Sequence, residues 1–158
     1  MSETDCIERR LWHDRPHGDP KQWSISRLAY VGDAVFEMYV RMAMVTASEA
    51  PSGALHGQSI KIVSATAQVA ALDKLQAVLS VDEANLVRRG RNAKISSMPK
   101  HADKATYRRA TGFEALLGYL YLDGQDERIA ELCRLVLEDV HAGTTYQSVT
   151  QRTKPETN

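Results

Sequence analysis

The spacing of apolar residues along the chain predicts an all-α protein. After Ser24 or Ser26, either of which can cap a helix, apolar residues recur every three to four positions as far as Ala47. The same period returns in the stretches 58–79, 82–90, 104–109, 111–122 and 126–140. No stretch alternates apolar and polar residues as a half-buried strand would. We therefore expect a bundle of helices without a sheet.

Length and composition indicate one folded domain. The 158 residues are 43% apolar and 25% charged, which suits one core and leaves too little chain for a second. The longest apolar run, at about 115–122, is too short to span a membrane, and the polar start MSETDCIERR does not resemble a signal peptide. We expect a cytoplasmic protein with a variable leading segment over 1–23, a folded domain over 24–142 and a polar, mobile tail over 143–158.

Two acidic residues interrupt apolar helix faces. Asp33 lies in LAYVGDAVFE and Glu114 in ATGFEALLGYLYL, and in each case the helical neighbours are mostly apolar. A carboxylate removed from water is costly unless a cation or hydrogen bonds neutralise it. Gly32 and Gly118 lie close to these acids in sequence, and glycine within a helix suggests close packing of a second backbone. We expect the two helices to cross there and the carboxylates to form a Mg²⁺ site in the core.

The acids also have simpler interpretations. Asp33 could form a core ion pair with Arg27 or Arg41. Glu37, one helical turn after Asp33, could support the metal site from a second layer, or it could pair with Arg41.

Basic residues are concentrated in one segment, although the formal net charge of the chain is zero. Residues 86–112 contain eight Lys and Arg residues and a single acid, Asp103. The central sequence RGRNAKISSMPKHAD has no clear period and predicts a surface connection. Such a segment is either a solvated charged face or a surface for the phosphates of a nucleic acid. The candidate RNA-binding residues are Arg89, Arg91, Asn92, Lys94, Lys100 and Arg108.

Several ordered motifs resemble one known family. They are LAYVGDAVFEMYVR, VSATAQVAAL, RRGRNAK, PKHAD and YRRATGFEALLGYLYLDGQDERI, and together they resemble the Mini-ribonuclease III family, the short relatives of ribonuclease III. The resemblance covers about residues 28–136. It implies a ribonuclease III-type catalytic domain over 24–142 that forms a symmetric homodimer and cleaves double-stranded RNA with Mg²⁺. The implied substrate is the 23S ribosomal RNA precursor stem, and a ribosomal protein helper is left open.

The resemblance assigns roles to the same two acids. Asp33 and Glu114 match the acidic positions of the family motifs and are expected to be catalytic metal ligands. The expected reaction is metal-assisted hydrolysis, in which each subunit of the dimer cuts one strand. Ser26, Ala29 and Thr111 occupy positions where full-length ribonuclease III carries further acids, so the number of metal ions per site stays open.

Two other functional classes remain as alternatives. The first is a helical metal phosphohydrolase of the histidine-aspartate kind, which His13, Asp14 and His56 faintly resemble. The second is a non-catalytic RNA-binding or ribosome-associated protein that shares the fold. After Val140 the sequence leaves no room for a double-stranded-RNA-binding domain, so we expect the catalytic dimer itself to bind the duplex.

Overall fold

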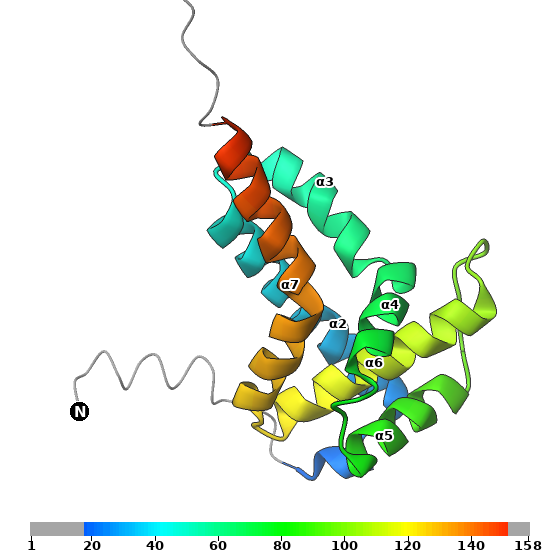
Figure 1. The fold of residues 1–158 in the computed structure, drawn as a ribbon. Helices are drawn as coiled ribbons and strands as arrows, with labels where there is room; N and C mark the ends of the chain where they lie inside the picture. The colour runs from blue at the N-terminus through cyan, green and yellow to red at the C-terminus, as the bar shows by residue number, and fades with distance from the viewer. Residues whose placement is uncertain (1–17, 152–158) are drawn as a thin grey trace, which may run out of the picture.

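The computed structural model describes residues 18–151, and it describes side chains as far as Val140. Within this range the chain forms a short 3-10 helix and six α-helices, with no strand, which confirms the all-α prediction (Figure 1). The elements are η1 (Pro20–Gln22), α2 (Ile25–Ala47), α3 (Ser52–Val63), α4 (Ala65–Leu75), α5 (Val81–Asn92), α6 (Lys104–Leu122) and α7 (Asp126–Gln151). None of these helices is long and apolar enough to cross a membrane.

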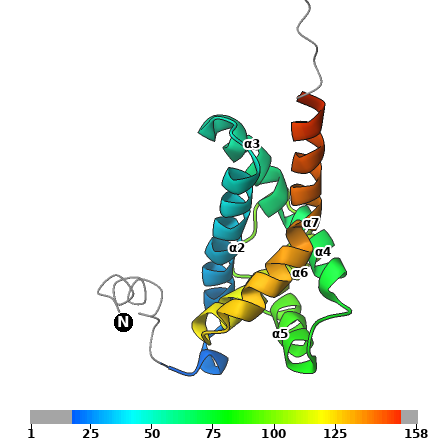
Figure 2. The ribbon, with the colours of Figure 1, turned by 60° about the vertical axis from the view of Figure 1, so that its left-hand side comes forward.

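Helix α6 is the central element of the bundle. It runs obliquely through the molecule, and α2, α4, α5 and α7 all pack against it (Figures 1 and 2). Leu116 and Leu117 are fully buried, and Phe113 meets Phe36 of α2 edge to face, with ring centroids 5.0 Å apart. Burial of these apolar side chains provides the main driving force for the fold. A functional group on the α2 face of α6 is therefore held by the packed core of the protein.

The predicted first core helix is confirmed. Ser24 precedes α2 and its hydroxyl accepts a hydrogen bond from the backbone N–H of Arg27 at 3.4 Å. This is the cap that the sequence suggested, and the helix ends at Ala47 as expected.

The single helix expected over 58–79 is wrong, because the chain forms two helices there. Ser64 has an extended backbone, with ψ of 151°, which ends α3 and starts α4. Its hydroxyl donates to the carbonyl of Lys61 at 2.9 Å and accepts from the N–H of Ala67 at 3.3 Å. One serine thus satisfies backbone groups at both helix ends. The stretch 48–57, which lies between two predicted helices, is also partly helical, since α3 begins directly after Pro51.

Three helix ends differ from the sequence pattern. Helix α5 continues past Gly90 to Asn92, because Gly90 lies inside the helix and packs against Gly112 of α6, where an added Cβ would lie 2.6 Å from the Gly112 Cα. The two helices expected on either side of Ala110 are one continuous helix, α6. Helix α7 extends beyond residue 140 to Gln151, while the leading residues 1–17 and the last residues 152–158 lie outside the described chain.

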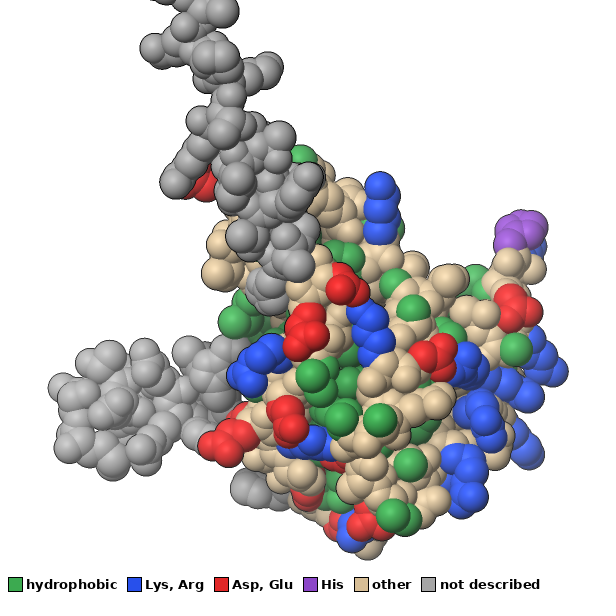
Figure 3. Space-filling model, viewed as in Figure 1, with side chains coloured by type: hydrophobic (Ala, Val, Ile, Leu, Met, Phe, Trp, Pro, Cys, Tyr) green, Lys and Arg blue, Asp and Glu red, His purple; other side chains and the backbone are tan. Residues whose placement is uncertain are grey.

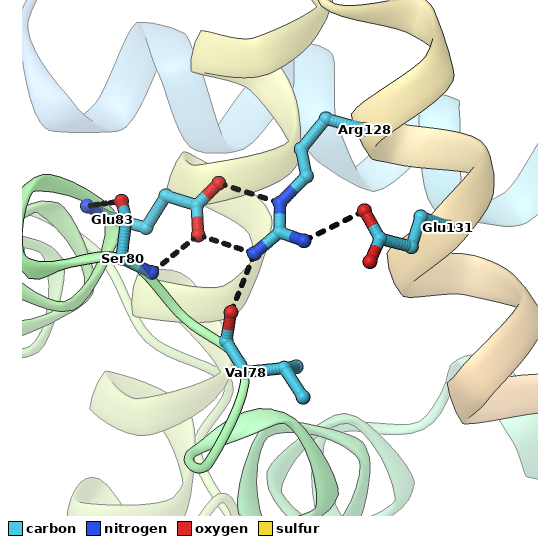
Figure 4. A network of polar contacts seen from close by, with 5 residues as sticks. All are labelled: Val78, Ser80, Glu83, Arg128 and Glu131. Atoms are coloured by element: carbon cyan, nitrogen blue, oxygen red, sulfur yellow. Dashed lines mark hydrogen bonds and ion pairs between the residues drawn. The ribbon is translucent and has the colours of Figure 1, made fainter.

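A buried polar network fastens α7 to the start of α5 (Figure 4). Arg128 donates to both carboxylate oxygens of Glu83, at 2.9 and 2.8 Å, to the carbonyl of Val78 at 2.6 Å and to Glu131 at 2.7 Å. Glu83 also accepts from the N–H of Ser80 at 2.8 Å and completes a capping box. Hydrogen bonds from Arg128 hold the pKa of Glu83 below its usual value. The network is structural, and it fixes the base of α5 against the bundle.

Candidate active site

Helices α2 and α6 cross at two glycines. A Cβ on Gly32 would lie 1.7 Å from the carbonyl oxygen of Glu114, and a Cβ on Gly118 would lie 1.9 Å from the carbonyl oxygen of Leu28. Real Cβ atoms do not approach backbone so closely, so any larger residue would push the helices apart. The crossing that the glycines predicted is confirmed.

Asp33 and Glu114 line one pocket beside this crossing, with a volume of about 440 Å³. Its walls come from residues 25–33 of α2, from residues 90–97 at the end of α5 and in the following loop, and from residues 107–114 of α6. The acids do not share one environment. Glu114 is partly buried, whereas Asp33 is exposed, so the expectation that both lie in the core is wrong for Asp33. The reason is that the outer face of α2 is uncovered in the single chain, as Tyr30 at 84% exposure shows.

Both carboxyl groups are harder to ionise than usual. Burial raises the pKa of Glu114 to about 7, a hydrogen bond from Gln68 opposes the rise, and the charge of Asp33 adds to it. Although the side chain of Asp33 is exposed, the protein around it removes part of its water, and this effect and then the charge of Glu37 raise the pKa of Asp33. None of the ion pairs among the described residues involves Asp33 or Glu114. The pocket therefore has negative charge that a cation would stabilise.

The pocket fits a hard cation such as Mg²⁺. Carboxylate oxygens are the protein ligands that Mg²⁺ prefers, and it commonly uses only one or two of them with water and substrate phosphate. In the part of the chain that the structure describes, no cluster of three or more His, Cys, Asp or Glu side chains could hold a metal ion. Ser26, Ala29 and Thr111 also line the pocket, so the positions to which the resemblance assigned further acids lie at the site. The site offers two carboxylates to a cation.

The arginines proposed as partners of Asp33 lie elsewhere. Arg41 donates to Glu37, with its Nε 2.9 Å from Oε1, and Arg27 lies over the ring of Trp23. The ion-pair interpretation therefore applies to Glu37 and not to Asp33. A supporting role of Glu37 in the metal site stays a prediction, since its charge still acts on Asp33.

The structure divides the predicted RNA-binding residues among different surfaces. Lys94 and Arg108 line the pocket of the two acids, and the Nε atom of Arg108 is buried without a hydrogen-bond partner among the described residues. Arg89 lines a separate pocket next to Asp82 and Glu83. Arg89 is therefore separated from the pocket of the two acids.

The remaining candidates for RNA binding belong to α5 and to the loop between α5 and α6. Arg91 lines a shallow groove together with Arg88 and Arg109. Asn92 and Lys100 are exposed, at the end of α5 and in the loop before α6. The space-filling view shows basic side chains gathered over α5 and the start of α6, while acidic side chains predominate on the other side of that face (Figure 3). The charge concentration predicted from the sequence is therefore also a concentration in space.

Two residues at the site were missed by the sequence analysis. The hydroxyl of Tyr107 donates to the carbonyl of Ser97 at 3.4 Å, which ties the loop of the pocket to α6. Gln68 of α4 is 1% exposed, and its amide acts on the pKa of Glu114 although it does not line the pocket. A signal for Gln68 was present, because it shares an apolar helix face with Leu72 and Leu75.

The histidine-aspartate alternative receives no support from the described residues. His56 is exposed on α3 and does not line the pocket of the two acids. His13 and Asp14 lie outside the described chain.

Comparisons with known proteins agree with this arrangement. The family model of the Ribonuclease III domain matches residues 26–125. Mini-ribonuclease 3 of Symbiobacterium thermophilum is 45% identical over 116 residues, which are 73% of this chain and 89% of that protein. Mini-ribonuclease 3 of Enterococcus faecalis is 42% identical over 124 residues, which are 77% of this chain and 94% of that protein. The crystal structure of a Fusobacterium nucleatum protein that is 24% identical superposes with a TM-score of 0.69. The superposition covers 78% of this chain and 98% of the Fusobacterium chain, and it supports the fold.

The matched region contains the whole pocket apart from Ile25, at its edge, and includes both acids and both glycines of the helix crossing. The identity to the Mini-ribonuclease 3 proteins extends over most of their length. This chain therefore belongs to the ribonuclease III domain family and, within it, to the Mini-ribonuclease 3 proteins.

Proposed function

We propose that this protein is a double-strand-specific endoribonuclease in which Asp33 and Glu114 hold Mg²⁺. The observation that carries the proposal is the meeting of two uncompensated carboxylates in one pocket, at the glycine crossing of α2 and α6, in a chain of this family. Carboxylates with raised pKa values are typical of functional sites.

The residues of the pocket have distinct roles in this proposal. When bound, Mg²⁺ supplies an activated water and neutralises charge that develops on the phosphate during hydrolysis. Asp33 and Glu114 fix the ion, and no side chain needs to act as a nucleophile. Lys94 and Arg108 bind phosphate oxygens of the RNA strand at the pocket that they line together with the two acids.

The proposed substrate is the double-stranded stem of the 23S ribosomal RNA precursor. Basic residues spread over α5 and the following loop would contact phosphates on both sides of a groove of the RNA duplex. Such contacts recognise the A-form shape of the duplex and not its sequence. Assistance by a ribosomal protein and a cytoplasmic location stay predictions.

The active form in this proposal is a symmetric homodimer. Three large apolar side chains on the outer face of α2 are exposed to solvent: Tyr30 (84% exposed), Met42 (57%) and Val45 (67%). A shallow, mainly apolar groove on the same helix includes Met38 and Met42. An apolar face of this kind marks an interface, and a twofold partner there would place two sites on one duplex for a staggered cut.

One assay separates the proposed function from both alternatives. The purified chain is incubated with long duplex RNA, single-stranded RNA and nucleotides, with and without Mg²⁺. We expect staggered cuts in the duplex alone, and only with Mg²⁺. Binding of the duplex without cleavage would instead favour a non-catalytic RNA-binding protein, and hydrolysis of nucleotides would favour a different phosphohydrolase.

A further inference from the structure

A buried glutamine lies directly behind one of the proposed metal ligands. Gln68 is 1% exposed, and its side chain comes from α4, which packs against α6 and contributes no residue to the lining of the pocket. Its amide lies close enough to the carboxyl group of Glu114 to oppose the rise in the pKa of that group. Glu114 thus has the pocket on one side and a fixed amide on the other.

The break between α3 and α4 orients this amide. The extended backbone of Ser64 ends α3, and the carbonyl of Val63 accepts a hydrogen bond from Nε2 of Gln68 at 3.2 Å. An amide nitrogen carries two hydrogens, so Nε2 can donate to Val63 and to Glu114 together. The carbonyl of Val63 also excludes the flipped amide, because two oxygens would then face each other.

The same arrangement leaves Gln68 incompletely satisfied. Its Oε1 is buried and has no hydrogen-bond partner among the described residues. A buried acceptor without a donor costs about 1–3 kcal/mol, and native proteins rarely keep one without a reason. Capping the carbonyl of Val63 alone does not explain why a glutamine with an unsatisfied buried oxygen is present here. An amide N–H directed toward Glu114 does explain it.

We propose that Gln68 is a positioning residue that orients the Glu114 carboxylate toward the divalent ion. Groups that hydrogen-bond a metal ligand fix its direction, and their removal typically weakens metal affinity or activity by about 10–100-fold. The inference rests on the proposed function, because it needs Glu114 to be a metal ligand.

The test uses the full chain with Gln68→Met, which keeps the length of the side chain and removes the amide. Mn²⁺ binding to the RNA-free protein is titrated by electron paramagnetic resonance, and cleavage of duplex RNA is measured at saturating substrate. We expect Mn²⁺ affinity and kcat to fall about tenfold or more, while the KM for duplex RNA stays unchanged. Ser59→Ala is the control, since Ser59 is 4% exposed and donates only to the backbone of Leu55. It should lose some thermal stability and keep the Mn²⁺ affinity.

Wild-type Mn²⁺ affinity in a folded Gln68→Met protein would overturn the proposal. If that variant does not fold, the wild-type protein supplies the readout, because the side-chain amide NMR signal of Gln68 should shift on titration with Mg²⁺. An unmoved signal at saturating Mg²⁺ would also overturn it. Failure of the proposed function is distinguishable, since Asp33→Asn and Glu114→Gln would then bind Mn²⁺ as the wild type does.

Discussion

The backbone of Gly32 lies against the backbone of Glu114 so closely that a Cβ on the glycine would be 1.7 Å from the glutamate carbonyl oxygen. The next residue after this glycine is Asp33, so the packing of the two helices and the meeting of the two acids are one feature. A change that separates the helices should therefore damage the site as well as the fold.

Gly32→Ala tests this coupling. The added methyl group must push α2 away from α6, and we expect a loss of at least about 3 kcal/mol in the free energy of unfolding, together with loss of cleavage. Denaturant unfolding measures the stability. Gly57→Ala is the control, because Gly57 lies inside α3 with nothing within 4 Å of the added Cβ, and it should gain roughly 0.5–1 kcal/mol. Equal stability of the two variants would show that the helices are not held at this crossing.

Glu114→Gln should stabilise the metal-free protein while it abolishes cleavage. The pKa of Glu114 is raised from 4.5 to about 7 on folding, so the folded protein holds this proton more tightly than the unfolded chain. The stability that the proton contributes is complete below pH 4.5 and is lost as the pH rises through about 7. With a chelator present at about pH 8, the free energy of unfolding of the Glu114→Gln variant should exceed that of the wild type by up to about 3 kcal/mol. The difference should shrink toward about pH 5, and thermal unfolding at both pH values measures it.

A stability difference that is independent of pH would mean that Glu114 ionises as freely in the folded chain as in the unfolded one. The same shift predicts that divalent ions bind the wild-type protein more weakly below about pH 7, since protons then compete for the carboxylate.

Lys94 and Arg108 should contribute more to duplex binding than Arg89 does. The first two line the pocket where the proposed reaction takes place, whereas Arg89 lines a different pocket. Each phosphate contact that is lost should reduce the slope of log affinity against log salt by about one. We expect this for Lys94→Met and for Arg108→Met, measured with catalytically inactive protein, and little change for Arg89→Met. Equal effects of all three would indicate a diffuse basic surface in place of a phosphate site at the pocket.

Val45→Lys should separate the proposed dimer. Val45 and Met42 are exposed on the outer face of α2, and a charge buried in an interface is costly. At concentrations where analytical ultracentrifugation shows the wild type as a dimer, we expect this variant to sediment as a monomer. Its cleavage of duplex RNA should also be reduced. Ile60→Lys, on α3 and 53% exposed, should leave the dimer intact. A wild-type monomer that cuts both strands with full activity would contradict the dimeric arrangement.

Much of the fold was predictable because its signals are local. The apolar period and the Ser24 cap determine α2, and glycines beside acids indicate where α2 and α6 meet. The pairing of Asp33 with Glu114 followed from two similar sequence patterns, and both residues do line one pocket.

The errors arose where a residue had a tertiary role that its local sequence does not reveal. Gly90 was interpreted as a helix end, but it is a packing position against Gly112. Ser64 breaks a continuous apolar period, and its capping hydrogen bonds outweigh the pattern. Asp33 is exposed although its helical neighbours are mostly apolar, because no other part of the described chain covers this face of α2.

Single-turnover cleavage of duplex RNA by Asp33→Asn tests the central claim most directly. The substitution keeps the shape of the side chain and removes the charge that would hold Mg²⁺ beside Glu114. We predict that the variant folds, binds the duplex with wild-type affinity in the absence of divalent ions, and cleaves at least about 10³-fold more slowly with Mg²⁺. Cleavage by this variant at the wild-type rate would contradict the assignment of the pocket as the catalytic metal site.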